Sequence, residues 1–98
     1  MSKIETVCEA IATRHLLQIC YQRNYRIVEP NGYGVDANGH PALLAWQVEG
    51  GGGWDNGHGW RLLAISAMEN VTLLDETFAG PRPRDQGQPE LPAVYAHA

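Results

Sequence analysis

The chain has 98 residues, of which 44% are hydrophobic and 18% are charged, and its formal net charge is −4. This length predicts one domain, and this composition is typical of an ordinary soluble globular protein. The negative charge argues against a generally basic nucleic-acid-binding protein, and leaves only a local basic patch open. The sequence shows neither a signal-peptide core nor an apolar run near the roughly 18 residues of a membrane span. We therefore expect a cytoplasmic protein with no membrane association.

Cysteine and histidine show no pattern that would build a metal or redox site. Cys8 and Cys20 have no CxxC spacing, and we expect both to be buried reduced thiols. The histidines are scattered, with no helical pair and no acidic residue at ligand spacing: His15, His40, His58 and His97. We therefore expect no metal and no cofactor.

The first predicted element is a helix from Ser2 to Thr13. Its apolar residues recur with helical spacing and form one stripe, which consists of Ile4, Val7, Cys8 and Ile11. Ser2 and Glu5 fit a capping box, in which each side chain binds the backbone amide of the other residue. The stripe predicts that this helix packs on the sheet that follows.

Five short strands are predicted after the helix: Leu16–Gln22, Tyr25–Pro30, Ala42–Val48, Trp60–Leu63 and Asn70–Asp75. The first two form a tight hairpin, and Pro30 is expected to end the second because it has no amide donor. Asn38-Gly39 is the strongest hairpin signal. The apolar strand Ala42–Val48 is expected to be buried on both faces.

Strands this short and this numerous close most easily into a small barrel that has no free edges. We therefore predict a mainly β fold, an SH3-like or Sm-like five-stranded antiparallel barrel with the N-terminal helix across one opening, over residues 1–78. Residues 79–98 contain four of the six prolines and predict an extended or partly disordered tail. The apolar residues near its end are free to dock on the domain or on a neighbour: Leu91, Val94 and Tyr95.

Five segments occur in a recognisable order: Leu17-Gln18-Ile19-Cys20-Tyr21, Arg26-Ile27-Val28-Glu29-Pro30, Leu43-Leu44-Ala45-Trp46, Trp60-Arg61-Leu62 and Val71-Thr72-Leu73-Leu74-Asp75-Glu76-Thr77-Phe78. Together they make the chain resemble the WYL domain family over about residues 4–78. The family's naming triplet falls on Pro41-Ala42-Leu43, and the second arginine of its fourth segment falls on Ala64. The resemblance implies an SH3-like barrel with a regulatory role, which senses a ligand of nucleic-acid origin.

Arg26 and Arg61 are the best candidate site residues, because each lies in an otherwise apolar strand. A buried arginine is costly without an anionic partner, and its planar fork suits phosphate or carboxylate. We expect these arginines, with Tyr21 and Trp54, to frame a patch that binds a small anionic or nucleotide-type ligand. The alternative is exposure on the outer face, or pairing within the chain with Glu29, Glu49 or Asp75.

Trp54 belongs to an unusual loop, since six of the ten residues from Gly50 to Gly59 are glycine. The loop either covers a ligand pocket as a lid or simply connects two strands. It lacks the lysine and hydroxyl residue of a phosphate-binding Walker loop. The aromatic residues of the strands are either a stacking platform for nucleic-acid bases or part of the core: Tyr21, Tyr25, Tyr33, Trp46 and Trp60.

These observations favour a ligand-sensing regulatory module that is not an enzyme. The second hypothesis is an interaction or scaffold protein that forms a homodimer or docks on a larger regulator. It would use an exposed strand edge and the proline-rich tail. The third and weakest hypothesis is a small thiol enzyme, in which His15 would act as base for Cys8 or Cys20.

Overall fold

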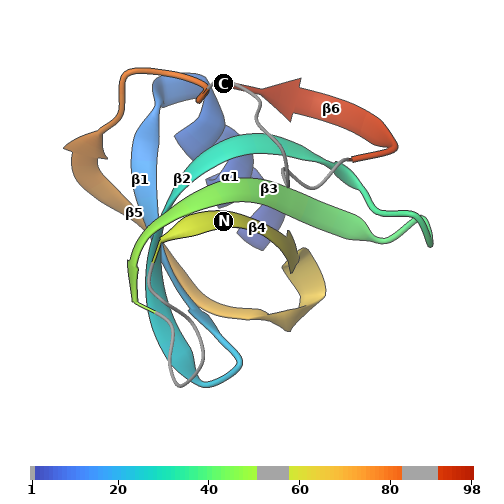
Figure 1. The fold of residues 1–98 in the computed structure, drawn as a ribbon, viewed down its shortest axis with the longest axis horizontal. Coiled ribbons are helices and arrows are strands. Elements are labelled where there is room, and N and C mark those ends of the chain that lie inside the picture. The colour runs from blue at the N-terminus through green and yellow to red at the C-terminus, as the bar shows by residue number, and fades with distance from the viewer. Residues whose placement is uncertain (1, 51–57, 83–90) are drawn as a thin grey trace.

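The structure, a computed structural model, describes residues 2–50, 58–82 and 91–98. One helix, α1 (Lys3–Thr13), is followed by strands and a short 3-10 helix, η1 (Ile65–Ala67) (Figure 1). The strands are β1 (His15–Tyr21), β2 (Asn24–Val35), β3 (Pro41–Gly50), β4 (Gly59–Ala64), β5 (Met68–Thr77) and β6 (Ala93–His97). The fold is therefore mainly β with one N-terminal helix, as predicted.

Helix α1 begins with the predicted capping box. The Ser2 hydroxyl accepts a hydrogen bond from the Glu5 amide at 3.1 Å, and Glu5 Oε1 accepts one from the Ser2 amide at 3.2 Å. These bonds satisfy two amide groups that the first turn leaves without helical partners. The buried face is formed by Val7, Ala10 and Ile11, while the predicted stripe residue Ile4 is 37% exposed.

The strands form one antiparallel sheet in the order β4-β3-β2-β1-β5, with β6 paired to β2. Strand β2 organises this sheet, because its first part pairs with β1 and its last part pairs with β6. The prediction that Pro30 ends the strand is wrong. Pro30 is buried inside β2, next to a break in register between Pro30 and Gly32. A bulge is one of the places where a strand tolerates the missing amide of proline.

The predicted closed barrel is also wrong, because the sheet is not closed. Among the described residues, β4 pairs only with β3, and β5 pairs only with β1. The chain passes from β4 to β5 through η1, and Ile65 of η1 and Met68, the first residue of β5, are buried in the hydrophobic core. The two outer strands of the sheet order are therefore joined through η1 and not by a backbone ladder.

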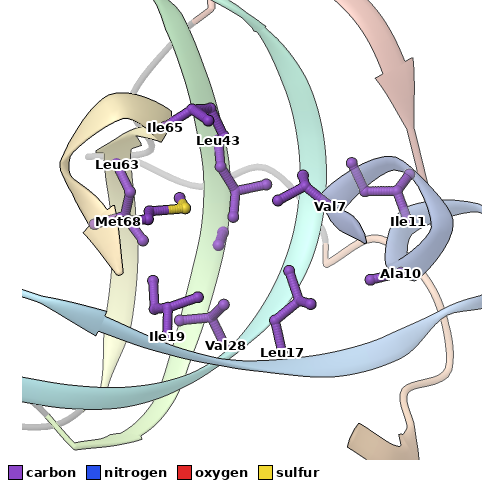
Figure 2. Close-up of a cluster of buried hydrophobic side chains, with 11 residues drawn as sticks. Val7, Ala10, Ile11, Leu17, Ile19, Val28, Leu43, Leu63, Ile65 and Met68 are labelled. Atoms are coloured by element: carbon purple, nitrogen blue, oxygen red, sulfur yellow. The ribbon is translucent and has the colours of Figure 1, made fainter. Parts of the chain in front are cut away.

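The hydrophobic core lies inside the curl of the sheet (Figure 2). Helix α1 packs across one end of this curl, where it contacts β1, β2, β5 and β6. The helix contributes three side chains and the sheet, with η1, contributes the others: Val7, Ala10, Ile11, Leu17, Ile19, Val28, Leu43, Ala45, Leu63, Ile65 and Met68. We call the sheet face that carries these residues the inner face, and the opposite one the outer face.

The end of the tail belongs to the sheet. Strand β6 pairs with the last part of β2, and the Ala98 amide donates to the Asn31 carbonyl at 2.9 Å (Figure 1). Gly34 permits this approach, because a Cβ atom there would lie 1.8 Å from the Ala93 carbonyl oxygen. The remaining tail residues 83–90 lie outside the described residues.

Candidate functional site

Arg26 and Arg61 project from the same face of the sheet. Residues directly opposite each other on paired antiparallel strands share a face. Arg26 on β2 is opposite Ile19 on β1, and Arg61 on β4 is opposite Ala45 on β3. Ile19 and Ala45 both belong to the core cluster. Both arginines therefore start on the inner face, which the sequence alone did not establish.

Arg26 is held by polar and aromatic contacts in the interior, where it is only 6% exposed. Its Nη1 donates to Gln47 Oε1 at 2.8 Å, and its Cζ lies 5.6 Å from the centre of the Tyr21 ring. Gln47 is itself fully buried and donates from Nε2 to the Gly50 carbonyl at 3.1 Å. The guanidinium group is therefore fixed in orientation by an amide and by the face of an aromatic ring.

Tyr21 connects β1 to the end of β4. Its hydroxyl oxygen accepts a hydrogen bond from the Ala64 amide at 3.3 Å, at the end of β4. Strands β2 and β3 separate β1 from β4 in the sheet order, so this contact crosses the inside of the curl. The Tyr21 ring packs against the core cluster and leaves one of its faces to Arg26.

Arg61 lies over the start of β4. Its Nη1 donates to the Trp60 carbonyl at 2.9 Å, and its Nη2 donates to the His58 carbonyl at 3.4 Å. Nη1 is also 3.2 Å from the position that a Cβ atom at Gly59 would take. Because Gly59 is opposite Gln47 in the sheet, Arg61 and the Arg26–Gln47 pair gather where the connection from β3 to β4 begins and ends. We call Tyr21, Arg26, Gln47 and Arg61 the inner-face cluster.

The remaining predicted site residue, Trp54, lies outside the described residues. Of the acidic partners considered for the arginines, Glu29 is on the outer face, where it binds Arg82 instead. Glu49 is opposite Ile27 and so projects away from Arg26, its neighbour along β2. Gln47, which the sequence did not single out, helps to orient Arg26. A buried polar residue in an apolar strand was the available signal.

The outer face carries an arrangement that the sequence did not predict. Trp46 and Trp60 are opposite each other on β3 and β4, and their rings meet edge to face at 5.6 Å. Arg82 lies over the Trp46 ring, with 4.3 Å between Cζ and the ring centre. The five strand aromatics therefore do not form one stacking platform, because Tyr21 packs on the inner face and the two tryptophans lie on the outer face.

The thiols show no catalytic arrangement among the described residues. Burial raises the pKa of the Cys8 thiol, which disfavours the reactive thiolate. The Nδ1 atom of His15 lies 2.7 Å from the Thr13 hydroxyl oxygen. The described part of the chain also holds no group of three or more histidine, cysteine or acidic residues placed to bind a metal ion. No helix within it is long and apolar enough to cross a membrane.

The comparisons with known proteins do not identify the chain. No family model, no curated protein and no solved structure matches it. The resemblance to the WYL domain family therefore stays a prediction.

Proposed function

We propose that this chain is a ligand-binding regulatory module of the WYL type, which binds a small anionic or nucleotide-type ligand at the inner-face cluster. One observation carries the proposal: Arg26 and Arg61 start on the same face, Arg26 is bonded to Gln47, and Arg61 lies against Gly59, which is opposite Gln47 where the β3–β4 connection begins and ends. Two positive charges on the same face of a sheet raise the local potential and attract an anion.

The surroundings of Arg26 support this proposal. An arginine orients a phosphate or carboxylate best when its fork is already fixed, because less conformational freedom is then lost on binding. Gln47 and Tyr21 supply such fixation, and Tyr21 is itself held by the Ala64 amide. Arg26 is also largely removed from water, which strengthens its electrostatic interactions.

A thermal-shift screen tests the proposal, with inorganic phosphate, ATP, cyclic nucleotides and short oligonucleotides as probes. A ligand at about 100 times its dissociation constant adds about 2.7 kcal/mol to the free energy of unfolding. We expect one of these probes to raise the melting temperature of the wild type. Arg26→Gln and Arg61→Gln should each remove the shift, and Arg23→Gln, at an exposed arginine of the β1–β2 turn, should keep it. No shift with any probe, or equal shifts in all three variants, would refute the proposal.

A second candidate function, that of an interaction protein, is favoured by the surface of β6. This strand pairs only with β2 among the described residues, and two of its apolar side chains are exposed, Val94 at 52% and Tyr95 at 65%. An exposed edge strand with apolar side chains is suited to pairing with another chain. Light scattering tests the homodimer: a dimer in the wild type that becomes a monomer in Val94→Lys supports it, and a monomeric wild type contradicts it.

A further inference from the structure

Arg82 is bound on the outer face of the sheet by a carboxylate, an aromatic ring and a side-chain acceptor for its backbone amide. Arg82 Nε donates to Glu29 Oε1 at 2.9 Å, and its Nη2 donates to Glu29 Oε2 at 3.0 Å. Its guanidinium lies over the Trp46 ring. The Arg82 backbone amide donates to Asn31 Oδ1 at 3.1 Å. A two-point carboxylate contact, an aromatic face and a backbone anchor thus converge on one residue, 53 positions away from Glu29 along the chain.

The residues that contact Arg82 lie on strands of the sheet. Glu29, Trp46 and Trp60 are opposite one another on β2, β3 and β4 and form one row on the outer face. Asn31 donates from Nδ2 to the Glu29 carbonyl at 3.0 Å, which orients its Oδ1 toward the Arg82 amide. The Glu29 side chain is only 12% exposed, whereas the Arg82 side chain is 39% exposed. We call Glu29, Asn31, Trp46 and Trp60 the outer-face site.

The segment that carries Arg82 lies outside the helices and strands, and prolines restrict its backbone. Residues 79–82 belong to no helix or strand. Arg82 lies between Pro81 and Pro83 in the sequence. Proline fixes its own backbone and biases the residue before it toward an extended conformation, so little conformational freedom is lost when this segment binds.

We propose that the outer-face site is a guanidinium-binding site for an arginine in a proline-flanked segment. Arg82 occupies it within the chain, and an arginine of another chain takes its place when Arg82 leaves. The planar guanidinium matches both the carboxylate fork and the aromatic face, which a lysine ammonium does not do. The partly exposed ion pair is screened by water, so exchange between the two arginines is feasible.

The test uses the full chain with Arg82→Ala, which empties the site. The probe is the peptide acetyl-Ala-Gly-Pro-Arg-Pro-amide, a copy of residues 79–83. Binding is followed through the tryptophan indole N–H signals of the ¹⁵N-labelled chain. We expect saturable binding to Arg82→Ala, and binding to the wild type that is weaker by about tenfold or more, because Arg82 already fills the site.

Matched controls separate guanidinium recognition from unspecific contact. A peptide with citrulline in place of arginine keeps the shape and loses the charge, so it should not bind, and a lysine peptide should bind more weakly. Glu29→Gln combined with Arg82→Ala should abolish binding of the arginine peptide. Equal binding of the citrulline peptide, or equal binding of the arginine peptide with and without the Glu29→Gln substitution, would overturn the proposal.

A second variant keeps the test valid if Arg82→Ala does not fold. If Arg82→Ala loses the amide signals of β6, the titration is repeated with Arg82→Gln, which keeps more of the side chain. Free arginine amide, run beside the peptide, distinguishes recognition of the guanidinium alone from recognition of the proline-flanked segment, for which the peptide must bind more tightly. Absence of peptide binding to a folded variant of Arg82 refutes the proposed site.

Discussion

Gln47 links the buried guanidinium of Arg26 to the backbone at the end of β3. It is fully buried, and both ends of its amide make hydrogen bonds, to Arg26 and to Gly50. Gln47→Leu keeps the volume and removes both bonds, and a buried group that loses a hydrogen-bond partner costs about 1–3 kcal/mol, and more where it is charged, as Arg26 is. We therefore expect a loss of about 2–4 kcal/mol in the free energy of unfolding, measured by urea denaturation.

Gln18→Leu is the matched control for this change. Gln18 lies on β1 opposite Ile27, half-buried on the outer face, so the same substitution removes an amide from a different environment. Its effect should stay within about 0.5 kcal/mol. Similar losses in the two variants would show that the Gln47 amide does not hold Arg26 in solution.

The sequence identifies the charges of the inner-face cluster but not their placement. Arg26 and Arg61 stand out as arginines in apolar strands, and alternation along each strand says which neighbours share a face. Alternation does not show whether residues of β2 and β4 share a face. That depends on how β3 is paired with each of them and on the bulges of β2. Arg82 could not be assigned at all, since its contacts cross more than half of the chain.

Strand β6 depends on one glycine of β2. Gly34→Ala places a Cβ atom 1.8 Å from the Ala93 carbonyl oxygen, and backbone on both strands must move to accommodate it. We expect β6 to separate from the sheet while β1 to β5 remain, because β6 pairs only with β2 in the described structure. Hydrogen exchange should then show loss of protection confined to the amides of β6 and of the adjoining part of β2.

Gly32→Ala provides the comparison on the same strand. A Cβ atom at Gly32 would meet Leu91 Cδ1 at 3.5 Å, which is an ordinary van der Waals contact. Protection of β6 should therefore survive in Gly32→Ala. Loss of protection in both variants, or in neither, would contradict the close approach of β6 to Gly34.

Patterns among neighbouring residues predicted which helices and strands form better than they predicted where these end. The capping box at Ser2 and Glu5 and the hairpin between β1 and β2 depend only on neighbouring residues, and both are confirmed. The end of β2 was predicted at Pro30 because proline lacks an amide. The strand instead continues through a bulge to Val35, since β3 and β6 offer partners that no local pattern reveals.

The overall shape depends on side-chain packing, which the number of predicted strands does not reveal. Five short strands predicted a closed barrel, yet the sheet stays open and its interior is filled by α1 and by residues around η1. The helix is therefore part of the core and not an addition to a finished barrel. Figure 2 shows its side chains facing those of β1 and β3 across the interior.

This view of the helix is tested by two isoleucines on α1. Ile11 is 2% exposed and belongs to the core cluster, whereas Ile4 is 37% exposed. Ile11→Ala should lower the free energy of unfolding by about 2–5 kcal/mol because it leaves a cavity. Ile4→Ala, the same change on the same helix, should cost less than about 1 kcal/mol, since little apolar surface is lost there.

The melting curves measured by circular dichroism and by tryptophan fluorescence must also agree. Far-ultraviolet circular dichroism follows the helix and sheet, and tryptophan fluorescence, measured with Trp54→Phe in the background, reports on β3 and β4, which carry Trp46 and Trp60. If α1 and the sheet form one cooperative unit, Ile11→Ala shifts both melting curves by the same amount. For a domain of this size each kcal/mol corresponds to about 4–8 °C, so the shift is easily measured. A helix that melts before the fluorescence changes, in wild type or variant, would show that α1 is not required for the core of the sheet.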